Sequence, residues 1–357
     1  MKREKIQPLD AAAMALAQAQ WNAVAKPLNS LGRFERLVIQ MAGITGSANV
    51  QVSPACVLVC CADNGVVAEG VSQSGQDVTR RVAQSIACGE ANVNLMAQAV
   101  SADVFCVDMG MAERVPDARI IDCSPGHGTG NIACGPAMTR EEAEHAVMQG
   151  KALVQTMKQR GYRMIATGEM GIGNTTTSSA VLAVLLGADV EAVTGRGGGI
   201  TEETFRKKKA VIRTAIEVNR PDRDDVVGVL SKVGGFDLAA MCGAFLGAAA
   251  ARRPAVIDGL ISAAAALCAV RLCPNVRGYL VPSHASFEIG YRLAMEAMDL
   301  RPLFDLGMRL GEGSGCPLAF QVLDAACAVI NDMATFDEAG INDDYLDEIR
   351  RGDQFTP

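Results

Sequence analysis

Short apolar runs that end abruptly at Asp, Gly, Ser or His recur along the middle of the chain. Clear examples are CVLVCCA before Asp63, DVFCVDMG ending at Gly110, RMIATG before Glu169, PAVI before Asp258 and RGYLVP before Ser283. Helix-length stretches separate them, such as TREEAEHAVMQGKALVQTMKQRG and TEETFRKKKAVIRTAIEVN. Buried strands that alternate with helices predict a parallel α/β sheet flanked by helices.

Both chain ends lack this strand pattern. Residues 9–25 are rich in Ala and Gln, and residues 316–351 carry a helical run followed by an acidic tail. We therefore predict two domains, because neither end fits into the sheet. A small helical domain would combine residues 1–50 with 316–357, and a large α/β domain would span residues 51–315.

The charge and the apolar content limit the classes of partner. The net charge is −7, and 49% of the residues are hydrophobic. Nucleic acid is not expected, because phosphate backbones are bound by clustered Lys and Arg. The longest uncharged apolar stretch, residues 238–251, is shorter than the roughly 18 residues of a membrane span. The chain also begins without the apolar core of a signal peptide, so we expect a cytoplasmic protein with no membrane segment.

The twelve cysteines do not have the spacing of a zinc site. Cys60 and Cys61 are adjacent, Cys56 lies on the same apolar run, and no CxxC pair occurs anywhere in the sequence. Only three histidines could join them. We expect small, buried, reduced thiols and no bound metal ion.

The loop ATGEMGIGNTTTSS at residues 166–179 joins a predicted strand to a predicted helix. Glycine and hydroxyl residues at such a junction favour an anion held by backbone N–H groups. The loop lacks the Gly-Lys-Ser/Thr ending of a nucleoside-triphosphate loop. Because parallel strands bring their carboxyl ends to one edge, the polar strand ends predict one extended ligand site. The alternative is that each is an ordinary turn.

A second glycine cluster, LGMRLGEGSGCPLAF, places Glu312 between Gly311 and Gly313. Glycine on both sides of an acid is hard to explain by packing, since glycine weakens a fold through backbone entropy. The pattern favours a functional carboxylate. The alternative is a glutamate that simply stabilises the start of the next helix.

Eight segments, in order, resemble the nicotinate-nucleotide:dimethylbenzimidazole phosphoribosyltransferase family. They are KPLNSLGR, DNGVVAEGVSQS, GTGNIACGPAM, GEMGIGNTTTSSA, SKVGGFDLAAM, DGLISAAAAL, LVPSHAS and LGEGSG, and the similarity covers roughly residues 20–335. The resemblance implies a Rossmann-like sheet and transfer of phosphoribosyl from nicotinate mononucleotide to a base. Nicotinate is released, and the product is an α-ribotide for cobamides such as vitamin B12. No cofactor is implied, because the pyridinium leaving group departs neutral.

The resemblance also assigns roles to particular residues. It makes Glu312 the general base that takes the proton of the incoming base. Glu169 would be a second carboxylate that supports the cationic sugar, or else it caps the following helix. Lys208 would pair with a phosphate or carboxylate, while His284 is expected to be structural. The remaining implied substrate contacts are Gly171, Gly173, Asn174, Thr175, Thr176, Asp237, Asp258, Gly259, Ser286, Gly311 and Gly313.

The acceptor pocket departs from the family pattern. Ser74 fits a position facing the incoming base, but Val82 stands where benzimidazole-using relatives carry a Gln, and Gln84 lies two residues further on. Losing an amide makes the pocket more apolar, so a benzimidazole and a phenolic base both remain candidates. Relatives are dimers, which leaves a homodimer or a heterodimer with a homologous chain. A non-catalytic partner subunit and a general nucleotide-binding protein also stay open as interpretations.

Overall fold

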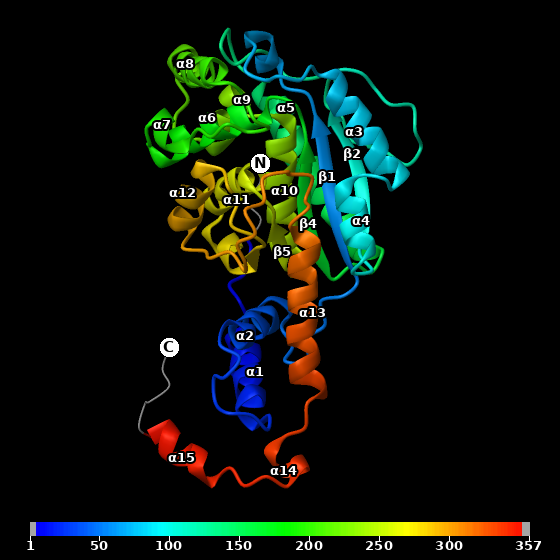
Figure 1. Cartoon of the computed structure of the whole chain (residues 1–357), viewed down its shortest axis with the longest axis vertical. Helices are drawn as coiled ribbons and strands as arrows, with labels where there is room; N and C mark the ends of the chain where they lie inside the picture. The colour runs from blue at the N-terminus through cyan, green and yellow to red at the C-terminus, as the bar shows by residue number, and fades with distance from the viewer. Residues whose placement is uncertain (1–4, 352–357) are drawn as a thin grey trace. The chain divides into compact units, whose positions relative to one another are not determined.

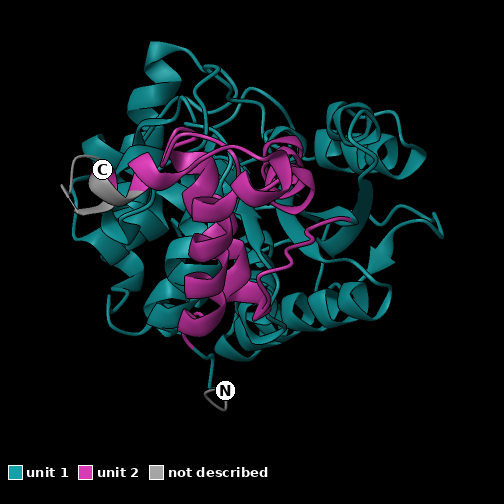
Figure 2. Cartoon of the chain, turned by 90° about the horizontal axis from the view of Figure 1, so that it is seen from below, with its two compact units in different colours: residues 1–7, 54–319 teal, residues 8–53, 320–357 magenta. Residues whose placement is uncertain are grey.

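The computed structural model describes residues 5–351, which form two compact units (Figures 1 and 2). Unit 1 contains residues 5–7 and 54–319, and unit 2 contains residues 8–53 and 320–351. Each unit therefore joins segments from distant parts of the sequence, as the two colours in Figure 2 show.

The sequence predicts two domains, residues 1–50 plus 316–357 and residues 51–315. That these segments are separate domains stays a prediction. Residues 1–4 and 352–357 in that division lie outside the described residues.

Unit 1 contains a sheet of six parallel strands in the order β3-β2-β1-β4-β5-β6. The strands are β1 Ala55–Ala62, β2 Asp103–Gly110, β3 Ile121–Asp122, β4 Met164–Met170, β5 Ala255–Ile257 and β6 Leu280–Pro282. This is the strand order of the doubly wound dinucleotide-binding fold, so the predicted Rossmann-like sheet is confirmed. In that order the connections leave β1 and β4 in opposite directions, which opens a crevice beyond their carboxyl ends.

Apolar residues in these strands do not alternate with polar ones, because helices cover both faces of the sheet. All eight residues of β1 are buried, and β1 pairs with β2 and β4 along nearly its whole length. Figure 1 shows α3 (Asp77–Cys88) and α4 (Asn92–Gln98) on one side of β1 and β2, with α10 (Phe236–Ala250) on the other. A two-sided parallel sheet of this kind needs Val, Ile, Leu and Cys at nearly every position.

Small residues allow the helices on the α10 face to pack closely. A Cβ on Gly243 of α10 would lie 2.7 Å from the carbonyl carbon of Val147 on α5, and Gly150 meets Ala240 in the same way. The Ala-rich sequence therefore reflects close helix packing. The other helical elements of unit 1 are η1 Gly65–Glu69, α5 Arg140–Gln159, α6 Asn174–Leu186, α7 Val190–Val193, α8 Glu202–Asn219, α9 Val226–Val233, α11 Leu260–Leu272, η2 Pro274–Tyr279 and α12 Ile289–Met298.

Two strand predictions need correction, and one strand was not predicted. The strand predicted to stop before Glu169 continues through Met170, because Glu169 still pairs with Cys60 of β1. The RGYLVP run is a strand only over β6, since the 3₁₀ helix η2 takes up its first residues. The two-residue strand β3 was not predicted, because it is too short to show a pattern.

Unit 2 is helical. It contains α1 (Ala11–Ala23), α2 (Arg33–Thr45), α14 (Phe336–Ala339) and α15 (Asp344–Arg351), together with the later part of α13 (Cys316–Asp332). Within residues 5–351, we find no helix with both the length and the apolar character needed to cross a membrane.

Candidate active site

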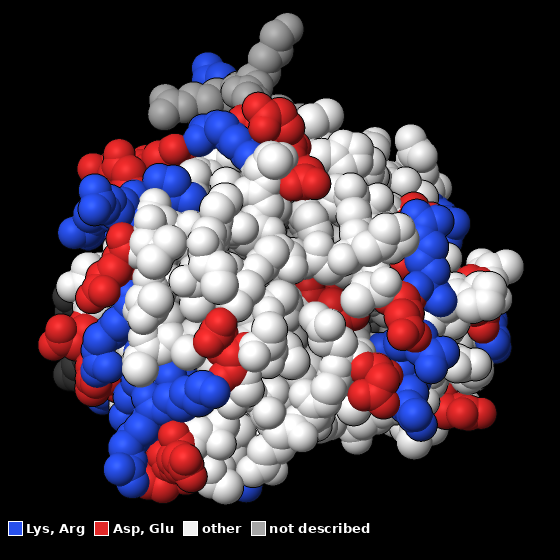
Figure 3. Space-filling model, turned by 90° about the horizontal axis from the view of Figure 1, so that it is seen from above, with Lys and Arg blue, Asp and Glu red and all other residues white. Residues whose placement is uncertain are grey.

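A cavity of about 340 Å³ opens beyond the carboxyl ends of β4, β5 and β6. The segments that follow β1, β4, β5 and β6 line it, together with residues 196–200 and 309–312. This is the crevice that the strand order creates. Figure 3 shows the molecule from this side, with Lys and Arg gathered toward the margins and a few acidic side chains within a largely uncharged centre.

The loop after β4 directs the start of α6 at the cavity. Gly171, Gly173, Asn174 and Thr175 all line the cavity. Gly173 precedes α6 with φ +94° and gives the helix no side-chain cap, and a Cβ on Gly171 would collide with the Ala62 carbonyl oxygen. An uncapped helix N-terminus built from glycines is a site for an anion such as a phosphate.

Lys208 approaches the same place from α8. Its Nζ donates to Thr175 Oγ1 at 2.8 Å and to the Gly195 carbonyl oxygen at 3.2 Å. The side chain is 1% exposed, and burial lowers its pKa to about 8, although the nearby Glu288 carboxylate acts in the opposite direction. An ammonium has three N–H donors, so one is left for a ligand. Lys208 and the start of α6 together favour binding of a phosphate.

Glu312 lies at another wall of the cavity. Its backbone is left-handed, with φ +62°, which is uncommon for a residue other than glycine. Its carboxylate accepts a hydrogen bond from the Val93 N–H in the first turn of α4, yet Oε2 is buried without a partner. Burial outweighs that bond and raises the pKa of Glu312. A carboxylate with a raised pKa and a free oxygen can accept a proton from a ligand.

Glu169 and Asp237 share the side-chain amide of Asn174. The Asn174 nitrogen donates to Glu169 Oε2 and, at 3.2 Å, to Asp237 Oδ2. Burial is the main cause that raises the pKa of Glu169 well above its usual range, and the Asp237 charge adds to it. Burial likewise raises the pKa of Asp237 to about 6. The two carboxyl groups form a pair of acids beneath the α6 loop, of which only Glu169 lines the cavity.

Asp258, the residue after β5, lines the cavity but directs its hydrogen bonds away from it. Its two carboxylate oxygens accept from backbone N–H groups of the loop that carries Glu312. Burial raises the pKa of Asp258 to about 7, and these hydrogen bonds act against that shift. His284 lies nearby, with its pKa lowered to about 4 by burial, so the imidazole is neutral at pH 7.

The predicted acceptor side of the cavity mixes apolar residues with Ser72, Gln73 and Ser74. Val82 of α3 lines it beside Ser74 and Met170, whereas Gln84 is exposed and lies outside the lining. The helix spacing explains this, because residues two apart on a helix point in different directions. The expectation that Gln84 points elsewhere is confirmed.

All but three of the predicted site residues line this one cavity. Thr176 is buried inside α6, Gly313 faces Val57 and Gly168, and Asp237 lies behind Asn174. Their direct contact with a substrate stays a prediction. The predicted residues that the structure brings together at the cavity are Glu312, Glu169, Gly171, Gly173, Asn174, Thr175, Lys208, Asp258, Gly259, Ser286, Gly311, Ser74 and Val82.

Sequence reasoning missed Arg196, Glu288 and Arg309, which also line the cavity. Glu288 Oε1 accepts from the Gly197 N–H at 3.0 Å and so holds the glycine-rich segment 195–199 in place. The sequence GRGGG around these glycines was a signal that could have pointed to Arg196. Arg309 lies in the second glycine cluster, LGMRLGEGSG, which was a similar signal, whereas Glu288 stands in a segment without such a motif.

Comparison with known proteins agrees with the predicted resemblance. The family model described as "Phosphoribosyltransferase" matches residues 6–341. A relative from Clostridium tetani, named nicotinate-nucleotide–dimethylbenzimidazole phosphoribosyltransferase, is 42% identical over 97% of this chain and 96% of its own. A relative of the same name from Ruminiclostridium cellulolyticum is 46% identical over 94% of this chain and 96% of its own.

The fold agrees as well. The crystal structure of CobT from Thermus thermophilus superimposes with a TM-score of 0.89 at 38% identity, covering 93% of this chain and 99% of that one. The resemblance seen in the eight sequence segments is thereby confirmed. The chain belongs to the nicotinate-nucleotide–dimethylbenzimidazole phosphoribosyltransferase family.

Proposed function

We propose that this chain transfers the phosphoribosyl group of nicotinate mononucleotide to a benzimidazole-type base and releases nicotinate. The product is an α-ribotide of the kind used as the lower ligand of cobamides such as vitamin B12. Relatives that share 42% and 46% of its residues are named for this activity with dimethylbenzimidazole. The observation that carries the proposal is one cavity that joins a phosphate site at Thr175 and Lys208 to the free oxygen of Glu312.

In the proposed reaction a nitrogen lone pair of the base forms the new bond to C1′ of the ribose. The bond from C1′ to the nicotinate ring nitrogen breaks, and its electron pair stays on the neutral pyridine nitrogen. Attack from the face opposite the departing ring inverts C1′, which gives the α-ribotide. The proton that the base must lose passes to the Glu312 carboxylate.

Charged groups elsewhere in the cavity would bind the phosphate and the ribose of nicotinate mononucleotide. Lys208 and the α6 N-terminus would hold the 5′-phosphate, because both are positive and both reach Thr175. Glu169 would lie near the ribose as positive charge develops there, as its place on the cavity wall allows. These groups bind and orient the nucleotide, while Glu312 takes the proton.

A phenolic acceptor is the second candidate, and Val82 is the observation that favours it. Val82 itself offers no amide to a second ring nitrogen, and its apolar side chain suits a benzene ring. Glu312 would then take the proton of the phenol.

We also propose a dimer, formed with an identical or a homologous chain, and a cytoplasmic location. Native mass spectrometry of the purified chain checks the first point. A stable monomer that shows full activity would contradict the dimer.

The test of the main proposal is an assay of the purified full chain with nicotinate mononucleotide and 5,6-dimethylbenzimidazole, with the products resolved by mass. Glu312→Gln keeps the shape of the side chain but removes the base, so we expect kcat to fall by about 100-fold or more. Glu141→Gln, an exposed position in the first turn of α5, is the matched control and should keep full activity. No ribotide from the wild-type chain, or equal activity in Glu312→Gln, would contradict the proposal.

A further inference from the structure

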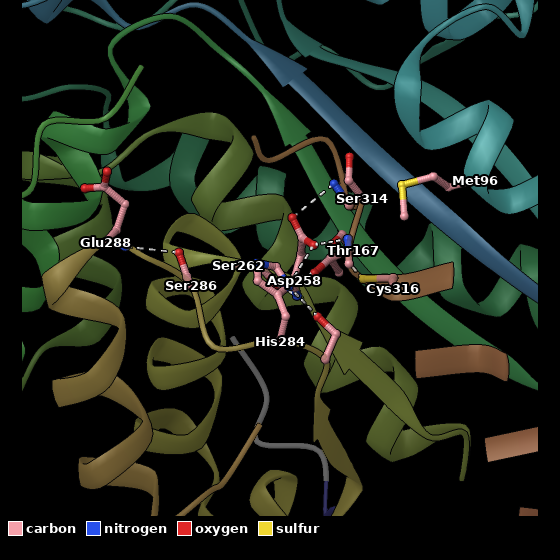
Figure 4. A network of polar contacts seen from close by, with 12 residues as sticks. Met96, Thr167, Asp258, Ser262, His284, Ser286, Glu288, Ser314 and Cys316 are labelled. Atoms are coloured by element: carbon pink, nitrogen blue, oxygen red, sulfur yellow. Dashed lines mark hydrogen bonds and ion pairs between the residues drawn. The ribbon is translucent and has the colours of Figure 1, made fainter. Parts of the chain in front are cut away.

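Asp258 connects the end of β5 to the loop that carries Glu312. Its Oδ2 accepts the Gly313 N–H at 3.2 Å, and its Oδ1 accepts the Gly315 N–H at 2.8 Å. The side chain is 2% exposed. Figure 4 shows Asp258 at the centre of this polar network, between Ser262 and Ser314. Both of its oxygens are thus engaged by the protein backbone.

The loop held in this way has an unusual backbone. Gly311, Glu312 and Gly313 follow one another with φ of +90°, +62° and +83°. The left-handed region disfavours a glutamate, so this conformation persists only where neighbouring groups fix it. Asp258 accepts two hydrogen bonds on the carboxyl-terminal side of Glu312, beginning at the very next residue, and a backbone bond from Ser314 N–H to the Gly311 carbonyl closes the same turn.

The backbone of Asp258 is also held in place, by a hydrogen bond to Ser262. Its backbone N–H donates to Ser262 Oγ at 3.1 Å, and Ser262 Oγ lies 2.8 Å from Thr167 Oγ1 on β4. His284 Nδ1 is 3.8 Å from Asp258 Oδ1, too far for a hydrogen bond. The carboxylate therefore has a defined orientation toward the loop.

We infer that Asp258 is a positioning residue that holds the Glu312 carboxylate in place for proton removal from the acceptor base. This differs from the direct substrate contact that the family resemblance implies for Asp258. The inference rests on the proposed function and deepens it. Asp258 acts through the backbone of Gly313 and Gly315, so its effect on turnover should depend on Glu312 being present.

The test is a double-mutant cycle between Asp258→Asn and Glu312→Gln in the full chain, with kcat and KM for nicotinate mononucleotide measured separately. An asparagine can accept one of the two N–H bonds but presents an NH₂ group to the other. We expect Asp258→Asn to lower kcat by about 10-fold or more and to change KM by less than about threefold. Added to Glu312→Gln, it should lower kcat by less than about twofold.

Asp108 offers a matched control at the end of another strand. It is buried, and its Oδ1 accepts the N–H groups of Gly110 and Met111 at 2.8 and 2.9 Å, but it does not line the cavity. Asp108→Asn should leave kcat unchanged. A fall in kcat equal to that of Asp258→Asn would overturn the inference, because any buried aspartate of this type would then have the same effect.

Ser262→Ala is a milder second variant for the case in which Asp258→Asn does not fold. It removes the oxygen that receives the Asp258 N–H, so kcat should fall by about threefold, and only while Glu312 is present. Equal effects with and without Glu312, or a rise in KM in place of a fall in kcat, would mean that Asp258 contacts the substrate directly and would overturn the inference. An inactive wild-type chain would contradict the proposed function itself, which is a separate outcome.

Discussion

The backbone of Glu312 lies directly against Gly168 of β4. A Cβ on Gly168 would sit 2.6 Å from the carbonyl carbon of Glu312, a distance that real Cβ atoms do not show. The Glu312 loop is therefore packed against the sheet on one side and hydrogen-bonded to Asp258 on the other. The position of Glu312, the proposed general base, therefore requires a glycine at residue 168.

Gly168→Ala should accordingly displace Glu312 and lower kcat by about 100-fold, since an error of about 1 Å at a reacting group has an effect of that size. Gly135→Ala is the matched control, because a Cβ there meets nothing within 4 Å and its φ is not left-handed. Steady-state kinetics of both variants check this. Full activity in Gly168→Ala would show that the loop position does not matter.

The activity should have a bell-shaped dependence on pH. In the proposed reaction Glu312 acts when deprotonated, and burial raises its pKa, so kcat/KM should fall on the acid side at a pH above the usual glutamate value of about 4.3. The proposed phosphate contact needs protonated Lys208, whose pKa is lowered to about 8, so kcat/KM should also fall as the pH rises through about 8. In Lys208→Gln the alkaline limb should vanish. A limb that persists in that variant would contradict the assignment.

The acceptor preference should respond to Val82. Val82→Gln restores an amide to the cavity wall, and one hydrogen bond of about 1 kcal/mol should raise the ratio of kcat/KM for dimethylbenzimidazole over phenol by roughly five- to tenfold. Gln84→Val, at the exposed position two residues on, should leave the ratio unchanged. Competition between dimethylbenzimidazole, adenine and phenol, with products resolved by mass, gives the ratios. An unchanged ratio in Val82→Gln would mean that residue 82 does not determine the acceptor preference.

Unit 2 has a buried ion pair, and removing one of its partners should destabilise the unit strongly. Lys26 Nζ lies 2.6 Å from Glu35 Oε1, both side chains are less than 10% exposed, and Lys26 also lies over the Trp21 ring. Glu35→Gln leaves a buried charge without its partner, so the free energy of unfolding should fall by about 3–5 kcal/mol. Trp21 is the single tryptophan of the chain and is buried, so its fluorescence reports the unfolding of this unit in urea.

Ser53→Ala is the control for that measurement. Its exposed hydroxyl bonds the Asp324 carboxylate, and its loss should change the free energy of unfolding by about 1 kcal/mol or less. Equal effects of the two substitutions would contradict a special role for the Lys26–Glu35 pair.

The sequence was sufficient for the parts of the fold that depend on local pattern. CVLVCCA is apolar at every position, which only a strand covered on both faces requires, and it forms β1. Thr139 followed by Glu142 predicts the start of α5, and both hydrogen bonds of that capping box are present. The segments after β4, β5 and β6 meet at one cavity because parallel strands place their carboxyl ends on one edge, whereas Asp63 after β1 and Gly110 at the end of β2 do not line it.

The sequence could not show where a side chain directs its hydrogen bonds. Asp258 lines the predicted cavity, but its oxygens bond the N–H groups of Gly313 and Gly315, which are distant in sequence. Glu288 lines the cavity and bonds the Gly197 N–H of the GRGGG segment, which is 91 residues away in the sequence. These contacts depend on tertiary structure and have no local pattern.

In the proposed reaction Glu312 removes the proton of the acceptor base, and a series of benzimidazoles with increasingly acidic N–H groups is the sharpest test of that role. The measurement is the ratio of kcat for the wild-type chain to kcat for Glu312→Gln with each acceptor. A more acidic acceptor needs less help from a base, so we predict that the ratio falls steadily along the series. A ratio that stays constant would contradict the claim, because it would mean that Glu312 contributes equally whether or not a proton is difficult to remove.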